Sequence, residues 1–107
     1  MARTNKPTRP RLKPAAPEMR QICGLLAQEM LRWPDVHARA MFGMRAFYRE
    51  DTIFAMLPDT RAVETPWSIA YKLPETASKW RLLDLSDGSS IDVALVHLDR
   101  AYRKAVI

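Results

Sequence analysis

The chain has 107 residues and a mass of 12.3 kDa, which is the size of a single domain with one hydrophobic core. Hydrophobic residues make up 48% of it, and no apolar run approaches the roughly 18 residues of a membrane-spanning helix, so we expect no membrane partner. The single cysteine, Cys23, excludes an internal disulfide and a cysteine-based zinc site, and it favours a reducing cytoplasm.

The first 17 residues differ in charge from the rest of the chain. They hold five of the 17 basic residues and no acid, so the other 12 basic residues balance all 12 acids. Four prolines and few aliphatic residues make an ordered helix or core unfavourable there. We therefore predict a disordered, basic, proline-rich arm over residues 1–17 and a single neutral domain over residues 18–107. The arm has no apolar stretch, so we expect no secretory signal peptide in it.

An amphipathic helix is predicted to follow the arm. Pro17 suits the first helical position, and Pro34 ends the pattern. Between them, apolar residues recur at three- and four-residue spacing, at Met19, Ile22, Leu26, Met30 and Trp33. Glycine in the middle of a helix costs up to about 1 kcal/mol relative to alanine. We therefore expect another element to pack closely against Gly24.

Three strands are predicted in the middle of the chain. After a polar connection over residues 35–39, the segments 44–49 and 52–57 are rich in aromatic and branched residues, which indicates a hairpin. Its turn lacks glycine and asparagine, so we expect a loop longer than two residues around a type I turn. Residues 58–66 lack periodicity and are predicted to form a surface loop. Residues 67–73 then alternate large and small side chains, which is typical of a strand with one core face.

A fourth strand and a second helix are predicted to close the chain. Residues 80–85 have a strand pattern, but alternation leaves open whether Trp80 or Leu83 faces the core. Ser89, three residues before Asp92, resembles a capping box, and the helix after it buries an apolar stripe, Ile91, Leu95, Leu98, Tyr102 and Ala105. The order of elements favours a two-layer α+β fold. In it, an N-terminal and a C-terminal helix accompany an antiparallel sheet of about four strands with a β-hairpin.

Residue types that carry catalysis or bind metals are sparse. His37 and His97 have no partner at a metal-ligand spacing, and the three glycines lie too far apart for a phosphate-binding loop. Cys23 lies beside the apolar stripe of the first helix, where free cysteine usually acts as a small hydrophobe. We interpret Asp84 and Asp87 as strand-edge and turn residues. The prediction is a protein with no catalytic residue, no metal site and no cofactor.

Two features are candidates for binding. The arm is suited to lie along a nucleic-acid backbone, because phosphate neutralisation releases counterions whatever the base sequence. Its basic residues are Arg3, Lys6, Arg9, Arg11 and Lys13. A solvated tail is the competing interpretation. The fold would extend this basic surface if it gathered Arg39, Arg45, Arg49, Arg61 and Lys72. The aromatic residues of the strands are the second candidate, as stacking platforms for bases, although core packing explains most of them better. Tyr48 is the strongest exception, because its parity is opposite to that of Phe47.

Four short segments carry a resemblance to a known family. They are Met41-Phe42-Gly43, Ala46-Phe47-Tyr48, Ile53-Phe54-Ala55 and Ala70-Tyr71-Lys72. With the preceding helix they resemble the N-terminal domain of the TfoX competence regulators and other TfoX/YjbR-like small proteins, over residues 18 to about 73. Where that family has a further glycine, this chain has Met44-Arg45-Ala46.

The resemblance implies a small two-layer domain with an antiparallel sheet, a homodimer, and a role in regulation rather than catalysis. The residues that match the family motif, all with structural roles, are Met41, Phe42, Gly43, Phe54, Ala55, Tyr71 and Lys72. Gly43 is the residue that lets the chain turn tightly into the sheet, a role that its backbone freedom also suggests.

Three functions stay open on the sequence. The leading prediction is a non-enzymatic regulatory or protein-interaction module that pairs with another protein or with itself, because a sheet edge needs cover. The alternative is nucleic-acid binding through the arm. The third is a small ligand-binding protein or enzyme that uses a pocket under the sheet near Cys23 and His37.

Overall fold

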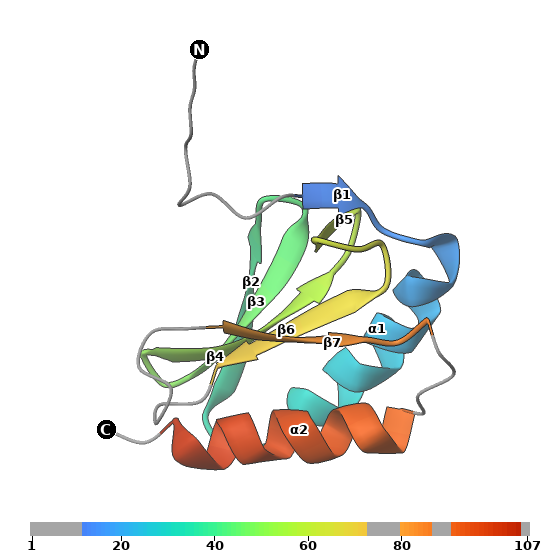
Figure 1. Cartoon of the computed structure of the whole chain (residues 1–107). Coiled ribbons are helices and arrows are strands. Elements are labelled where there is room, and N and C mark those ends of the chain that lie inside the picture. The colour runs from blue at the N-terminus through green and yellow to red at the C-terminus, as the bar shows by residue number, and fades with distance from the viewer. Residues whose placement is uncertain (1–11, 73–79, 87–90, 106–107) are drawn as a thin grey trace.

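The computed structural model describes residues 12–72, 80–86 and 91–105 (Figure 1). The elements in these residues are β1 (Leu12–Pro14), α1 (Pro17–Met30), β2 (Val36–Met41), β3 (Met44–Arg49), β4 (Thr52–Pro58), β5 (Arg61–Val63), β6 (Ser68–Lys72), β7 (Trp80–Asp84) and α2 (Ile91–Lys104). Five antiparallel strands form the main sheet in the order β2-β3-β4-β6-β7, and β1 pairs with β5 in a small second sheet. Both helices pack on one face of the main sheet, which confirms the predicted α+β class.

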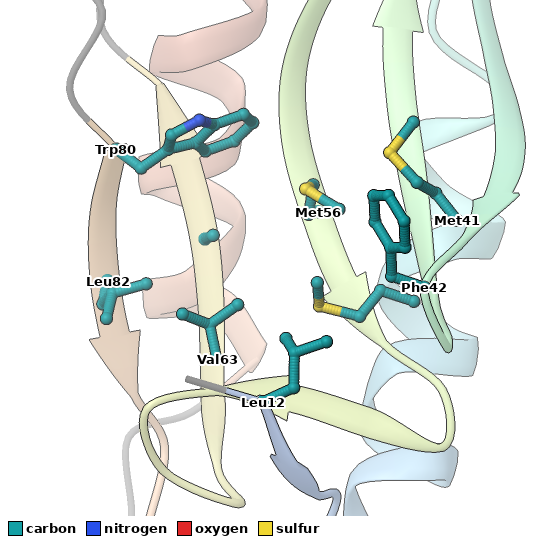
Figure 2. A pocket seen from close by; sticks show the side chains of 9 residues that line it. Leu12, Met41, Phe42, Met56, Val63, Trp80 and Leu82 are labelled. Carbon is teal, nitrogen blue, oxygen red and sulfur yellow. The ribbon is translucent and has the colours of Figure 1, made fainter. Parts of the chain in front are cut away.

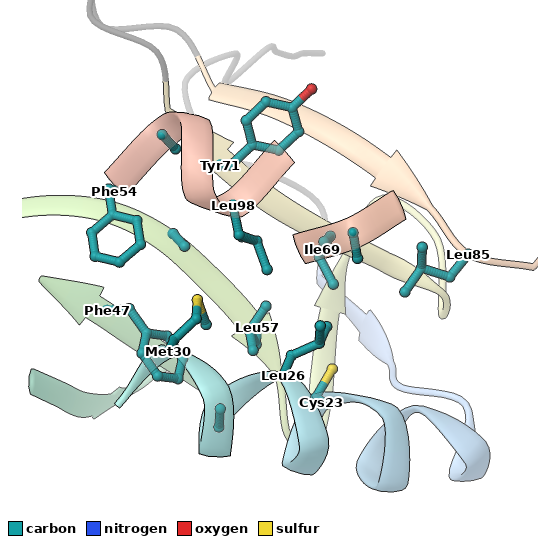
Figure 3. Packing of buried hydrophobic residues seen from close by; sticks show 14 of the residues in the cluster. Cys23, Leu26, Met30, Phe47, Phe54, Leu57, Ile69, Tyr71, Leu85 and Leu98 are labelled. Carbon is teal, nitrogen blue, oxygen red and sulfur yellow. The ribbon is translucent and has the colours of Figure 1, made fainter. Parts of the chain in front are cut away.

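The hydrophobic core lies between the helices and this inner face of the sheet (Figure 3). Phe47 on β3 and Phe54 on β4 are fully buried there, and Leu26 and Met30 of α1 and Leu98 of α2 pack with them. Burial of each such side chain stabilises the fold by about 1.5–3 kcal/mol, so this layer supplies most of the hydrophobic stabilisation.

Helix α1 begins at Pro17 as predicted, and the buried Met19, Leu26 and Met30 confirm its apolar stripe. It ends at Met30, earlier than the pattern suggested, so that Trp33 lies in the turn that follows. The expectation of close packing at Gly24 is wrong, because a Cβ built there meets nothing within 4 Å. Gly24 therefore weakens the helix without any packing reason.

Helix α2 buries the predicted face. Leu98 is fully buried, Leu95 is half-buried, and the fully buried Ala94 and Ala101 keep the helix close to the sheet. The predicted capping residue Ser89 lies outside the described residues, as do the turn at residues 87–88 and the connection over residues 74–79.

The predicted hairpin of β3 and β4 is confirmed, but its turn is shorter than expected. Arg49 pairs with Thr52, so the loop has two residues, and Glu50 takes a positive φ of 54° that it can hold without being glycine. A register shift after Phe47 leaves Phe54 as an extra residue in β4. This irregularity turns Phe54 into the core, where it is fully buried.

The predicted polar connection over residues 35–39 is wrong, because Val36–Met41 forms the edge strand β2. Its inner residues, Val36 and Ala38, are only half-buried, and its outer residues, His37 and Arg39, are exposed. A strand of small and polar residues at a sheet edge has no strong hydrophobic alternation, which is why the sequence pattern did not reveal it.

The boundary of the predicted arm and the loop over residues 58–66 both need correction. Leu12–Pro14 of the arm is strand β1, and it pairs with β5, which lies inside the predicted loop. The backbone N–H groups of Ala15 and Ala16 add hydrogen bonds to Thr60 and Pro66. The arm is therefore ordered from Leu12 onward, and the part of that prediction that concerns residues 1–11 lies outside the described residues.

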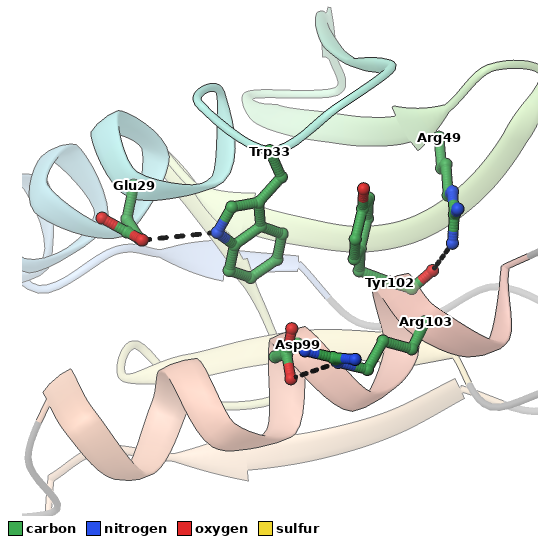
Figure 4. Close-up of polar contacts among 6 residues, drawn as sticks. All are labelled: Glu29, Trp33, Arg49, Asp99, Tyr102 and Arg103. Carbon is green, nitrogen blue, oxygen red and sulfur yellow. Dashed lines mark hydrogen bonds and ion pairs between the residues drawn. The ribbon is translucent and has the colours of Figure 1, made fainter.

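A cluster around Tyr102 joins α2 to the sheet and to the end of α1 (Figure 4). The Tyr102 hydroxyl donates to the Pro34 carbonyl oxygen at 2.9 Å, and its ring lies 5.0 Å from that of Trp33. The guanidinium of Arg49 lies over the same ring, 4.5 Å from its centroid, and donates to the Tyr102 carbonyl oxygen at 3.1 Å. A cation at the C-terminal end of a helix is favourable, so Arg49 stabilises α2 where it meets the sheet.

Candidate functional site

The outer face of the main sheet, opposite the helices, carries an apolar side chain from each of the five strands. Alternation along the strands and the pairing register bring these residues together. Met41 pairs with Met44 at the end of β2 and β3. Met56 pairs with Ala70, which in turn pairs with Leu82.

These residues line an apolar groove with a volume of about 390 Å³ (Figure 2). The small sheet of β1 and β5 forms one wall of it, through Leu12 and Val63. The nine lining residues, here called the outer groove, are Leu12, Met41, Phe42, Met44, Met56, Val63, Ala70, Trp80 and Leu82. This volume falls in the range of about 300–1,000 Å³ that is usual for binding pockets.

Phe42 is the most exposed large apolar residue of the groove, with 74% of its surface in contact with solvent. It forms the two-residue turn between β2 and β3 together with Gly43. Both residues have a positive φ, 55° at Phe42 and 76° at Gly43, which is the pattern of a type I′ hairpin turn. Asparagine and glycine suit the first position of such a turn, whereas phenylalanine is strained there.

Gly43 holds this turn against the wall of the groove. Its carbonyl oxygen accepts backbone hydrogen bonds from Asp59, Thr60 and Arg61, at 3.2, 2.9 and 2.9 Å. A Cβ on Gly43 would lie 2.6 Å from Cγ of Arg61 and 2.8 Å from Oγ1 of Thr60, so a larger residue does not fit unless these side chains shift. The predicted role of Gly43 in a tight turn is thus confirmed by its backbone and its surroundings.

Cations border the outer groove. Lys72 pairs with Trp80, and its ammonium group lies 5.9 Å from the centroid of the indole. Arg39 is exposed on β2 and pairs with Ala46 of β3, which in turn pairs with the groove residue Met56 of β4. Arg61 is exposed beside Gly43. None of these three cations makes an ion pair with another residue in the described part of the chain.

The five basic residues that the sequence left as a candidate patch are divided between two faces. Arg45 lies over the buried Phe47 ring at 5.7 Å, and Arg49 contacts Tyr102, so both belong to the helix side of the sheet. Arg39, Arg61 and Lys72 remain around the outer groove.

The residues that match the family motif lie on both faces of the main sheet. Met41 and Phe42 line the outer groove, and Lys72 lies at its border. The other residues apart from Gly43 belong to the core, where they are buried, namely Phe54, Ala55 and Tyr71.

Most of the predicted nucleic-acid contacts lie outside the described residues, because Arg3, Lys6, Arg9 and Arg11 precede β1. Lys13 is in β1, half-buried, and pairs with the buried Ala62.

The sequence analysis selected Tyr48 as the strongest exception to core packing, and it left Phe42 among the aromatic residues for which core packing was favoured. Tyr48 is half-buried and stacks on His37, with ring centroids 5.3 Å apart and planes 8° apart. Trp80 is exposed to 37% and lines the groove. The available signal was the presence of Met56 beside Leu57 in β4, since a strand that is apolar on both parities is typically covered on both faces.

The two residues that the sequence placed at one pocket, Cys23 and His37, lie on opposite faces of the main sheet. Cys23 is buried in the core on α1, whereas His37 is on the outer face of β2. Burial, with a smaller contribution from the charge of Asp59, raises the pKa of Cys23 to about 12, and Arg45 opposes the rise. The thiol is therefore protonated at neutral pH and is a poor nucleophile.

Asp84 and His97 each have structural partners. Asp84 accepts hydrogen bonds from the Thr65 hydroxyl and the Ser86 backbone N–H, both at 2.7 Å. Hydrogen bonds from Ser86, followed by that from Thr65, hold the pKa of Asp84 below its usual value. The ring of His97 packs 5.3 Å from that of Tyr71. Among residues 12–72, 80–86 and 91–105, no group of three His, Cys, Asp or Glu side chains is placed to hold a metal ion.

Comparison with known proteins finds no matching family model, no matching curated protein and no matching solved structure. The resemblance to the TfoX N-terminal domain stays a prediction. Neither α1 nor α2, the helices of the described residues, is long and apolar enough to cross a membrane.

Proposed function

We propose that this chain is a non-catalytic, TfoX-N-like regulatory module of the cytoplasm, and that its outer groove binds apolar side chains of a partner protein. The buried free thiol of Cys23 supports the choice of a reducing compartment. The volume and apolar lining of the groove support a binding function rather than a catalytic one.

Phe42 carries the proposal. Its positive φ costs about 1–3 kcal/mol in a residue with a side chain, and its ring stays 74% exposed to water. Neither the strained backbone nor the exposed ring stabilises the isolated chain. Asparagine at this position of the turn would make that chain more stable. A partner that covered the Phe42 ring would remove it from water, and the hydrophobic free energy of that burial would favour binding. Strain and exposure at the same residue are therefore the properties of a binding anchor.

The methionines of the groove support the same function. Met41, Met44 and Met56 are unbranched and have three rotatable bonds each, so they can adapt to the shape of partner side chains. Surfaces that bind proteins often combine such side chains with an aromatic anchor, which here are Phe42 and Trp80.

Selection of displayed random peptides on the immobilised chain tests this function. Selected peptides should carry apolar residues, and they should bind Phe42→Asn at least about tenfold more weakly, because a lost anchor costs 1.4 kcal/mol or more. Val96→Gln is the matched control, since Val96 is 65% exposed on α2, across the sheet from the groove. Equal affinity for wild type and Phe42→Asn would contradict the proposal.

Nucleic-acid binding through the arm is the second candidate. It is supported by the five basic residues without an acid among residues 1–17 on an otherwise neutral chain. Deletion of residues 1–11 distinguishes it from the groove, because the deletion should abolish DNA binding and leave peptide binding in place.

A further inference from the structure

We propose that the partner segment is an amphipathic helix with acidic side chains, whose apolar stripe fills the outer groove and whose carboxylates lie beside Arg39, Lys72 and Arg61. This inference rests on the proposed function, because it names the partner of the same groove. Three independent features of the described residues support it: the chemistry of the lining, the layering of the fold and the charge of the border.

The lining of the groove favours a helix over an extended peptide. Eight of the nine lining side chains have no hydrogen-bond donor or strong acceptor, and the indole N–H of Trp80 is the single conventional donor among them, so the floor can satisfy few groups of a peptide backbone. An extended peptide laid on that floor would bury backbone N–H and C=O groups without partners, at a cost of about 1–3 kcal/mol each. A helix satisfies these groups internally and presents only side chains to the groove.

The layering of the fold points to the same occupant. The inner face of the main sheet is covered by α1 and α2, whereas on the outer face the described residues supply only the small β1-β5 sheet at one end (Figure 1). An apolar sheet face is normally buried by another layer, most simply by helices. A partner helix would complete this third layer between Phe42 and Trp80, which lie on opposite sides of the groove in Figure 2.

The positive charge beside the outer groove favours a partner segment with acidic residues. The five strands of the main sheet contain one acidic residue, Asp84, which already accepts hydrogen bonds from Thr65 and Ser86. Arg39 and Lys72 have no ion-pair partner in the described part of the chain, so carboxylates of a partner would be their complement.

The start of the chain adds to this attraction. Leu12 lines the groove, and the residues that precede it in the sequence include Arg3, Lys6, Arg9 and Arg11 and no acid. These four positive charges precede the groove residue Leu12 in the sequence, and positive charge on the chain raises the rate of encounter with an acidic segment. Arg39 and Lys72 disfavour a second copy of this chain as the occupant, since a two-fold contact between outer faces would bring these like charges together.

Three synthetic peptides test the inference on the full chain by fluorescence anisotropy and circular dichroism. They share a helix-forming sequence with leucine at i, i+3, i+4 and i+7. The acidic peptide has glutamate at its other positions, the neutral peptide has glutamine there, and the leucine-free peptide keeps the glutamates but has glutamine for each leucine. The protein variants are Arg39→Gln/Lys72→Gln and, as a charge-matched control on the helix side, Arg32→Gln/Lys104→Gln.

We expect the acidic peptide to bind about tenfold more tightly than the neutral one at low salt, and this ratio to shrink at high salt. Its helicity should rise on binding, because short helices are marginal in water. The Arg39→Gln/Lys72→Gln variant should lose about three- to tenfold in affinity for the acidic peptide alone. The control variant should match wild type, and the leucine-free peptide should bind far more weakly.

Several results would overturn the inference, and they separate it from the proposed function. Equal affinity for acidic and neutral peptides, both lost in Phe42→Asn, would leave the groove function intact but remove the acidic partner. Binding without a gain in helicity would exclude the helix. Equal binding of the leucine-free peptide would move the site from the groove to the arm. A wild-type dimer in light scattering that Phe42→Asn dissociates would assign the groove to a second copy. If Phe42→Asn changed the affinity of no peptide, the proposed function itself would fail.

Discussion

The Cγ atom of Arg61 lies where a side chain on Gly43 would begin. A Cβ built on Gly43 would be 2.6 Å from this atom, while the Gly43 carbonyl oxygen accepts the Arg61 backbone N–H at 2.9 Å. The tip of the β2–β3 hairpin is thus fixed directly against β5. Since β5 and Phe42 both border the outer groove, this contact sets the shape of one end of the groove.

Gly43→Ala should destabilise the chain by about 1–3 kcal/mol, because alanine is strained at a φ of 76° and its Cβ meets Arg61. Gly24→Ala is the matched control. A Cβ at Gly24 meets nothing within 4 Å, so this exchange should stabilise α1 by about 0.5–1 kcal/mol. Urea unfolding of both variants measures the difference, and a Gly43→Ala variant as stable as wild type would contradict the tight contact.

Phe42→Asn should stabilise the isolated chain by about 1 kcal/mol, which corresponds to a rise of about 4–8 °C in Tm. Asparagine tolerates a φ near 55° better than phenylalanine does, and the largely exposed ring contributes little to the folded state. Phe42→Ala separates the two effects, since it removes the ring without relieving the backbone. A fall in Tm for Phe42→Asn would show that the ring stabilises the fold, and would weaken the case for Phe42 as a binding anchor.

The elements with strong periodicity were predictable from the sequence. The stripe of α1, the alternation of β6 and the hairpin of β3 and β4 each lie within a few consecutive residues. Strands β2 and β5 were not predictable in this way. β5 has three residues, and it owes its strand conformation to pairing with β1, some fifty positions earlier in the chain. Local propensity contains no information about such pairing.

The outer groove was less accessible to prediction than the fold. It brings together Leu12, Phe42 and Leu82, which are far apart in the sequence and meet only through the order of the strands. The exposure of Phe42 also depends on its place in a two-residue turn, whereas an aromatic residue in a short apolar segment is normally assigned to the core. One signal was present in β4, where Met56 and Leu57 make both parities apolar.

Cys23 should make the stability of the chain depend on alkaline pH. Its pKa is raised from the ordinary value of 9.0 to about 12, so above pH 9 the unfolded chain loses the thiol proton while the folded chain keeps it. The contribution of the protonated thiol to stability is complete below pH 9 and is lost as the pH rises from 9 toward 12. Between pH 7 and pH 10, the free energy of unfolding of wild type should fall by about 1.4 kcal/mol more than that of Cys23→Ala. Urea unfolding of both proteins at the two pH values measures this difference. Parallel pH profiles for the two proteins would show that the thiol does not titrate as its burial implies.

Thr65→Val should raise the pKa of Asp84 toward its usual value, because it removes one of the hydrogen bonds that favour the carboxylate. The lowered pKa means that Asp84 stabilises the fold above the ordinary pKa of aspartate, about 3.9, and that this contribution is lost as the pH falls below it. NMR titration of the Asp84 carboxyl carbon measures the change directly. Thr52→Val, a change elsewhere in the sheet, should leave this pKa as it is in wild type.

Two deletions should separate the arm from the groove. Deletion of residues 1–11 keeps β1 and Leu12, so Tm should match that of the full chain. Deletion of residues 1–14 removes the partner of β5 and one wall of the groove, and it should cost at least about 1 kcal/mol through the lost strand pairing. The acidic peptide should still bind the shorter deletion, though with a slower association rate, and should bind the longer deletion much more weakly.

The same deletions decide between the groove and the nucleic-acid alternative. If the arm contacts phosphates through Arg3, Lys6, Arg9 and Arg11, the full chain should bind duplex DNA with a log-log salt slope near −3.6, about −0.9 for each contact. Deletion of residues 1–11 should then abolish DNA binding and leave peptide binding in place. We expect the groove to be the specific site, so that the peptide and the DNA do not compete. DNA binding that survives in the shorter deletion but not in Arg39→Gln/Lys72→Gln would instead place nucleic acid on the outer face of the sheet, because these two cations border the groove.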